Sequence, residues 1–61
     1  PIENSLAELW SIFDLIMPGY LFSYKEFKSA YEMPIVKDED HEVMNKLKML
    51  IEFYALILIN T

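Results

Sequence analysis

Apolar residues recur at helical spacing near the start of the chain, where intervals of three and four residues predict an amphipathic helix. Ser5 followed by Glu8 fits a capping box, and Asn4 is an alternative N-cap. The dipeptide Pro18-Gly19 is expected to end the helix, because proline disfavours helical geometry in the residue before it. We therefore predict a helix over residues 5–17, with an apolar stripe made of Leu6, Leu9, Trp10, Phe13, Ile16 and Met17.

A second capping-box pattern, Ser23 with Glu26, predicts a short helix over residues 24–32. Pro34 is expected to stop this helix, because proline lacks the backbone donor that a helix interior needs. Residues 35–36 then form an extended link. The apolar side of the short helix consists of Tyr24, Phe27 and Tyr31.

The acidic run 38–40 suits the positive end of a helix dipole and can cap a third helix. No proline or glycine follows Pro34, so one long helix over residues 40–59 is the simplest interpretation. A strand over residues 53–59 is the alternative, because the period of a short apolar run does not separate the two. The helical stripe comprises Val43, Met44, Leu47, Leu50, Ile51 and Tyr54.

These elements predict an all-α fold, a three-helix fragment in which the first helix packs its Leu9, Trp10 and Phe13 face against the third. A chain of 61 residues buries only about 60% of its unfolded surface. Its hydrophobic fraction of 54% exceeds the roughly 45–50% of typical soluble domains. Apolar surface left over on the third helix is expected to produce a dimer, in which two copies bury what one cannot.

Charge and length exclude several classes of function. The net charge is −5, the five lysines are scattered and arginine is absent, which argues against direct nucleic-acid binding by this segment. The longest apolar run, residues 53–59, is far shorter than the roughly 20 residues of a membrane span. With no signal-peptide pattern either, we expect a cytoplasmic protein without a membrane partner.

The order of residues over 1–52 resembles one family closely. PIEN at the start, then LAELWSIFDLIMPG, then FSYKEF and Pro34-Ile35 are similar to the Swi/Snf family of helicase-like, DNA-dependent ATPases. The matching segment of that family follows the third helicase motif in the first RecA-like lobe. The resemblance implies a parent that uses ATP and Mg to translocate on duplex DNA, with the remainder of the ATPase as this segment's partner and DNA contacted only through the parent.

By the same resemblance, Glu3 and Asn4 belong to the region that couples the nucleotide cleft to the DNA side. The remainder would be scaffold, with a structural motif formed by Leu9, Trp10, Phe13, Pro18 and Gly19. The family pattern then continues Pro-Phe-hydrophobic-Leu-Arg-Arg after the position of Glu52, whereas this chain has FYALILI. We therefore treat 53–61 as a divergent tail, and a truncated or frame-shifted gene is one hypothesis for it.

The residues needed for phosphoryl transfer are missing from the sequence. There is no GxxxxGK[ST] loop, no Asp-Glu pair after an apolar strand and no arginine finger. We predict no catalytic residue, no metal site and no cofactor in this chain. The expected function is a non-catalytic fragment of a Swi/Snf-type ATPase, with scaffold and coupling roles in the parent. The alternative is a stand-alone helical self-association protein derived from a truncated ATPase gene.

Several candidate residues also have a purely structural interpretation. Glu3 and Asn4 suit a simple helix cap, and Trp10 fits the core better than a base-stacking site. The acidic run 38–40 lacks the glycine turn of a calcium loop and is more typical of a solvated helix start. His41 has no evident nucleophile to serve and is expected at the surface.

Overall fold

The computed structural model describes residues 1–60, and within that range the chain forms helices and turns without a strand. The elements in chain order are α1 (Ile2–Ile16), α2 (Tyr24–Phe27), the π-helical turn η1 (Lys28–Glu32), α3 (Met33–Asp38) and α4 (His41–Ile59). The middle three follow one another without interruption, so the chain has three helical segments, 2–16, 24–38 and 41–59. The predicted all-α class is confirmed.

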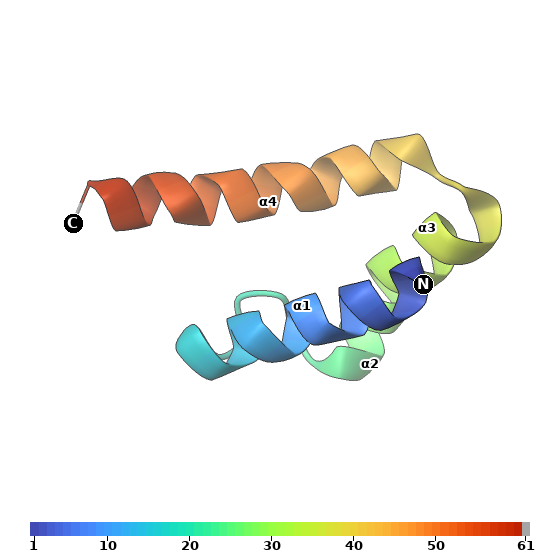
Figure 1. The fold of residues 1–61 in the computed structure, drawn as a ribbon, viewed down its shortest axis with the longest axis horizontal. Helices are drawn as coiled ribbons and strands as arrows, with labels where there is room; N and C mark the ends of the chain where they lie inside the picture. Colours follow the sequence, from blue (N-terminus) through green and yellow to red (C-terminus); the bar gives the residue numbers. More distant parts are fainter. Residues whose placement is uncertain (61) are drawn as a thin grey trace.

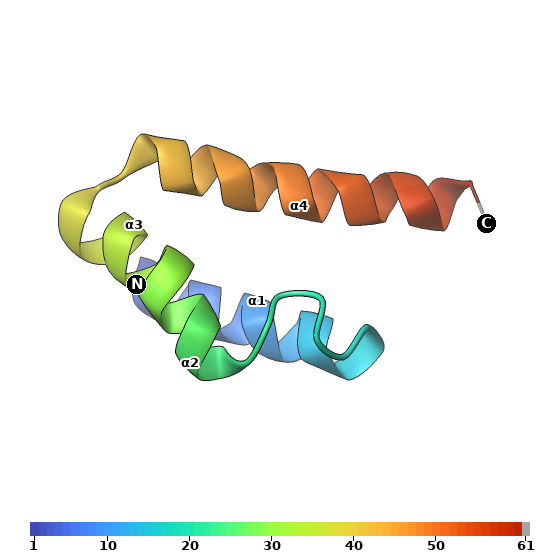
Figure 2. The same ribbon diagram turned by 180° about the vertical axis from the view of Figure 1, so that it is seen from behind.

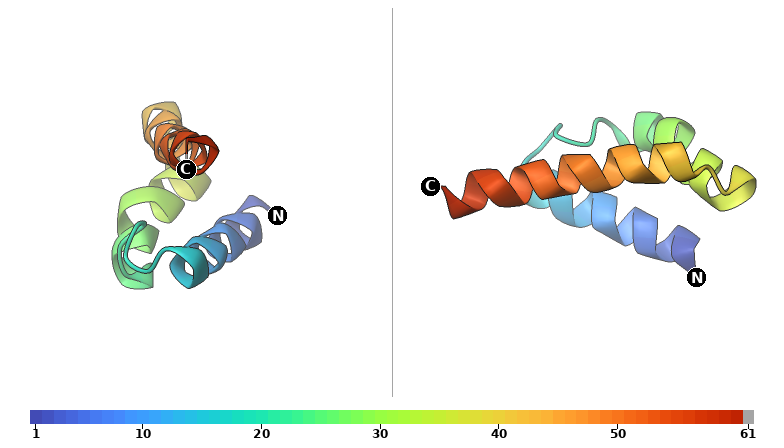
Figure 3. Two further views of the ribbon diagram at one scale, coloured as in Figure 1. Left: turned by 90° about the vertical axis from the view of Figure 1, so that its left-hand side faces the viewer. Right: turned by 90° about the horizontal axis from the view of Figure 1, so that it is seen from above.

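The three segments lie at the corners of a triangle when the molecule is viewed along α4 (Figure 3, left). α1 and α4 run in the same general direction, and the 24–38 segment runs back beside them (Figures 1 and 2). The C-terminal turns of α4 extend beyond the end of α1 (Figure 1). That part of α4 lies beyond the other helices of residues 1–60.

The core sits where the three segments meet and is small. Phe27 and Leu47 are almost completely buried, at 0% and 1% exposure. Each segment contributes to the core, and so does the turn between α1 and α2, through the buried side chains Leu6, Phe13, Leu21, Phe27, Ile35 and Leu47.

α1 begins at Ile2 rather than at residue 5, and the predicted capping box is wrong. The Ser5 hydroxyl donates to the Pro1 carbonyl at 3.4 Å instead of capping a new helix, and the Ser5 amide donates to the same oxygen at 3.2 Å. Proline is well tolerated at a helix start, because the backbone N–H it lacks would have no partner there. Glu3 in the first turn also suits the helix dipole.

The prediction that Pro34 stops the second helix is also wrong. The capping box of Ser23 and Glu26 forms as expected, but helical geometry continues through Pro34 to Asp38. The intervening turn widens to π geometry, where the Met33 amide donates to the Lys28 carbonyl. In the π turn an amide donates to the carbonyl five residues earlier and not four. A new α-helix begins after this turn, and Pro34 falls in its first turn, where the missing donor costs little. The expected extended link at 35–36 is therefore helical.

The third helix agrees closely with its prediction. The Asp40 carboxylate accepts from the amides of Glu42 and Val43, both at 3.1 Å, and thereby caps α4. Glu39, in the left-handed conformation with φ 49°, makes the sharp turn between α3 and α4. The tail over 53–59 is helical, which excludes the strand alternative.

Candidate functional site

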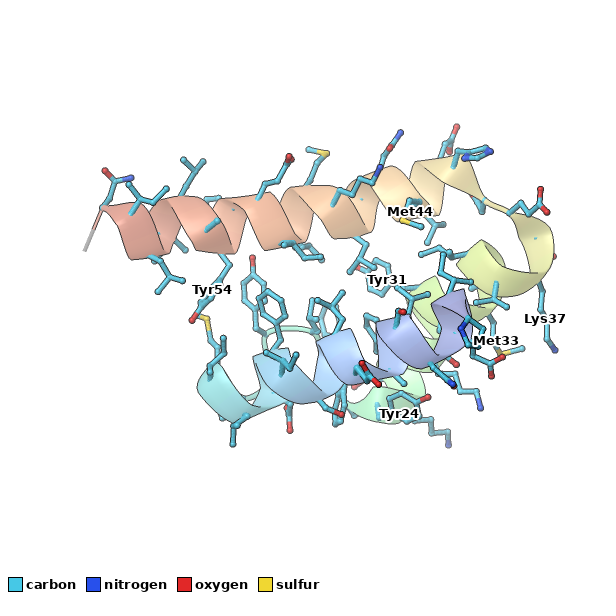
Figure 4. All side chains as sticks on the ribbon, in the orientation of Figure 1. Tyr24, Tyr31, Met33, Lys37, Met44 and Tyr54 are labelled. Carbon is cyan, nitrogen blue, oxygen red and sulfur yellow. The ribbon has the colours of Figure 1, made fainter. Side chains whose placement is uncertain are left out.

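The residues implicated in coupling lie at the exposed start of α1. Glu3 and Asn4 both face solvent in its first turn. Glu3 lies at the rim of a cavity of about 270 Å³ between α1 and the 24–38 segment. The other lining residues are Lys28, Glu32, Met33, Val36 and Lys37, of which Met33 and Lys37 are labelled in Figure 4. Asn4 does not line the cavity, so Glu3 and Asn4 have different surroundings although they are adjacent in sequence.

A buried carboxylate forms the floor of this cavity. Glu32 is only 2% exposed, and its Oε1 accepts a hydrogen bond from the Tyr24 hydroxyl at 3.0 Å. This bond to Glu32 raises the pKa of Tyr24, and removal from water and the charges of Glu32 and Glu3 act in the same direction. Tyr24 therefore remains a neutral donor at physiological pH and does not become a phenolate nucleophile.

The cavity combines two carboxylates with two lysines, a mixture suited to polar contacts with another protein segment. Among residues 1–60 there is no group of three or more histidine, cysteine, aspartate or glutamate side chains able to hold a metal ion.

The residues of the predicted structural motif contact two different parts of the molecule. Trp10 turns toward the α2 side, where its Nε1 donates to the Phe22 carbonyl at 3.0 Å and its ring meets Tyr24 edge-on at 5.2 Å. Phe13 faces α4, with its ring 5.2 Å from that of Tyr54. Leu9 is half-buried beside them. The expectation that the Leu9, Trp10 and Phe13 face packs on the third helix is confirmed for Phe13. The hydrogen bond and the ring contact of Trp10 are made with Phe22 and Tyr24, which the turn after α1 brings to the indole.

Pro18 and Gly19 begin the turn that makes this arrangement possible. Gly19 has φ 85°, a left-handed conformation that residues with a side chain adopt at a cost. Its amide donates to the Asp14 carboxylate at 3.4 Å, and this bond ties the turn back to the end of α1. The turn thereby places Tyr20 against Phe13, with the two rings stacked at 5.9 Å.

A second apolar stripe runs along α4 on the side away from the core. Met49, Phe53 and Leu56 are 67%, 58% and 56% exposed. Together with Tyr31 of η1 they border a shallow groove of about 630 Å³, which has Lys46 and Glu52 at its edges. None of the helices in residues 1–60 combines the length and apolar content needed to cross a bilayer. Because its large apolar side chains are exposed, the stripe is a candidate surface for contact with protein.

Two features of the site escaped the sequence analysis. The ring cluster of Phe13, Tyr20 and Tyr54 joins three segments that are distant in sequence. Glu32 gave no signal in the sequence, because in a regular helix it would lie about 100° away from Tyr31 and outside the stripe of Tyr24, Phe27 and Tyr31. It is buried at the end of the π turn, which periodicity does not predict.

Comparison with known protein families gives a match over nearly the whole chain. A family described as the SNF2-related domain matches residues 1–60. The match includes the tail after Glu52, where the sequence departs from the pattern described above. No solved structure gives a significant match.

Individual relatives match with substantial identity. The chain is 46% identical over 56 residues to YwqA of Bacillus subtilis, a candidate ATP-dependent helicase/translocase; the match covers 92% of this chain and 6% of that protein. It is 43% identical over 54 residues to the Zorya protein ZorD of Escherichia coli, which covers 85% of this chain and 5% of ZorD. It is 45% identical over 40 residues to human TATA-binding protein-associated factor 172, covering 66% and 2% respectively. The chain thus spans a small fraction of each relative's length.

Proposed function

The chain belongs to the SNF2-related family of helicases and translocases, and we propose that it acts as a non-catalytic helical element of such an ATPase. Its roles would be scaffold in the first ATPase lobe and coupling between the nucleotide cleft and the DNA side. The observation that carries this proposal is the family match across residues 1–60. ATP, Mg and duplex DNA would be handled by other parts of the parent.

The electrostatics of the chain support a role without chemistry. The sequence holds no arginine and no phosphate-binding glycine loop, and phosphoryl transfer depends on both kinds of group. The cavity beside Glu3 offers a mixture of positive and negative charges. Such a surface suits a polar contact with a neighbouring segment of the parent.

The exposed face of α1 supports the scaffold role. Ile12, Leu15 and Ile16 are 56%, 83% and 53% exposed and lie close together on the helix surface. A contiguous apolar face of this kind is unfavourable in water and marks a protein contact. We assign this face to the remainder of the ATPase lobe.

A chimera tests the proposal in the context of a complete enzyme. Full-length YwqA would receive this chain in place of its matching segment, and ATP hydrolysis would be measured with and without duplex DNA. If the chain is a scaffold and coupling element, the chimera should hydrolyse ATP and respond to DNA. The substitution Leu15→Glu should abolish the response by preventing docking of α1.

The coupling role has its own comparison within the chimera. The double substitution Glu3→Ala with Asn4→Ala should reduce the stimulation by DNA several-fold. Glu8→Ala is the matched control, because Glu8 is another exposed acid of α1 that lies away from the cavity. Equal stimulation in the double variant and in the control would refute the coupling role. An inactive but folded unsubstituted chimera would refute the scaffold role.

A further inference from the structure

α4 has two apolar faces, of which one packs against the core formed by residues 1–60. Its inner face packs on the core through residues that include Val43, Leu47 and Tyr54. Successive helix residues are about 100° apart, which puts Met49, Phe53 and Leu56 on roughly the opposite side. These three residues are exposed. A helix that is apolar on both sides is typical of one covered on both sides.

We infer that this outer stripe pairs with the same stripe of a second copy of the chain, with the two α4 helices antiparallel. The inference goes beyond the proposed function and uses a different face from the one assigned to the ATPase lobe. It rests on the placement of charge, on the register of the stripe and on the access that the fold leaves to α4.

The charge distribution favours a second copy as the partner. α4 carries two lysines, Lys46 and Lys48, and two glutamates, Glu42 and Glu52, so its formal charge is zero. The whole net charge of −5 therefore comes from residues 1–40. Two α4 helices can approach without the like-charge repulsion that contact between the other surfaces would meet.

When two copies of the stripe run antiparallel, the side chains of one copy face side chains of the other that can pack or pair with them. With the two-fold axis at the level of Ile51, Met49 of each copy lies opposite Phe53 of the other, and Lys46 lies opposite Leu56. The aliphatic stem of Lys46 can cover Leu56 while its ammonium group stays in water. On one flank, Glu52 of each copy comes within about 3 Å, measured along the axis, of Lys48 of the other.

Access to the stripe is open. The end of α4 projects beyond the other helices (Figure 1, and Figure 3, right). The stripe residues Met49, Phe53 and Leu56 are more than half exposed, and they line the shallow groove together with Tyr31 and Leu50. When a patch binds the same patch of another copy, both patches are used up in a two-fold symmetric pair. Assembly should therefore stop at two copies.

Light scattering coupled to size exclusion tests the pairing on the full chain. The expected mass is twice the 7.2 kDa of one chain. Phe53→Glu should raise the dissociation constant of the dimer by about a hundredfold, because each copy loses a buried aromatic side chain. Leu15→Glu on α1 is the matched control and should leave the dimer intact.

A monomer at high concentration, a larger oligomer, or disruption by Leu15→Glu in place of Phe53→Glu would each overturn the inference. A mixing experiment tests the charge contact without relying on the folding of Phe53→Glu. Lys48→Glu and Glu52→Lys should each dimerise poorly alone, because like charges then face one another. Mixed, they should form a one-to-one dimer, since every contact between positions 48 and 52 of the two copies then joins opposite charges. Failure of the mixture to pair would refute the proposed pairing of Lys48 with Glu52.

Discussion

The Tyr20 hydroxyl donates a hydrogen bond to the backbone carbonyl of Leu50, thirty positions along the chain. This bond joins the turn after α1 to the middle of α4. The Tyr20 ring also lies 5.6 Å from that of Tyr54 and stacks on Phe13. Tyr20 therefore connects the first and third helical segments, a role that Trp10 was expected to share.

The first prediction concerns this bond. Tyr20→Phe keeps the ring contacts and removes the hydroxyl, so it should lower the free energy of unfolding by about 1 kcal/mol. Urea denaturation followed by circular dichroism measures the change. Tyr54→Phe is the control, because in the described part of the chain its hydroxyl has no hydrogen bond like that of Tyr20. An equal loss in both variants would contradict the role given to the Tyr20 bond.

The second prediction concerns Gly19. A Cβ added there would meet no atom within 4 Å, so a substitution costs only what the backbone conformation imposes. Gly19→Ala should therefore destabilise the fold by about 1–2 kcal/mol. The chain is short enough for chemical synthesis, and D-alanine at the same position, which favours positive φ, should be at least as stable as glycine. If L-alanine and D-alanine unfolded at the same urea concentration, the left-handed turn would be wrong.

The third prediction concerns the cap of α4. Asp40→Ala removes an acceptor used by two backbone amides and should reduce stability by about 1 kcal/mol. Asp40→Asn and Asp40→Ser retain a capping oxygen and should recover most of the loss. Thermal unfolding of the three variants gives the comparison. Alanine as stable as asparagine would show that the cap contributes nothing.

The fourth prediction is a dependence on alkaline pH. Tyr24 has its pKa raised above the ordinary value of 10.0, first by its hydrogen bond to Glu32. The folded state therefore holds this proton more tightly than the unfolded state does. The stabilisation is complete below pH 10 and is lost as the pH rises from there through the folded-state pKa. Urea midpoints measured across this range should fall.

Tyr24→Phe is the matched variant for that measurement. It should be less stable than the parent chain at neutral pH, because the buried Glu32 carboxylate loses its phenol donor. It should also show a smaller decline above pH 10, since one titrating phenol has been removed. A variant with the same alkaline decline as the parent would exclude Tyr24 as its source.

Local patterns predicted most of the helices correctly, because those helices begin with caps that short sequence motifs specify. Ser23 with Glu26 and Asp40 with its following amides are contacts within three residues. α4 likewise follows from an uninterrupted helical stretch after Asp40. The family resemblance, carried by ordered strings over residues 1–52, is also confirmed.

The errors arose where neither apolar periodicity nor single-residue rules determine the backbone path. Pro34 ends a regular helix in isolation, but the π turn before it allows the helix to continue. The orientation of Trp10 depends on the path of the turn through Gly19 and Phe22, which periodicity does not describe. The roles of Glu3 and Asn4 remain proposals, because they depend on parts of an ATPase beyond these 61 residues.

The π turn over Lys28–Glu32 has a consequence for how length changes are tolerated. Each hydrogen bond of a π turn joins residues five positions apart, one more than in an α-helix, so the turn contains one additional residue. Deleting one residue there would restore regular spacing and rotate everything downstream by about 100°. Ile35 would then leave the core, and α4, which the turn at Glu39 joins to α3, would lose its present position against α1. The wide turn thus determines which side chains of α3 face the core.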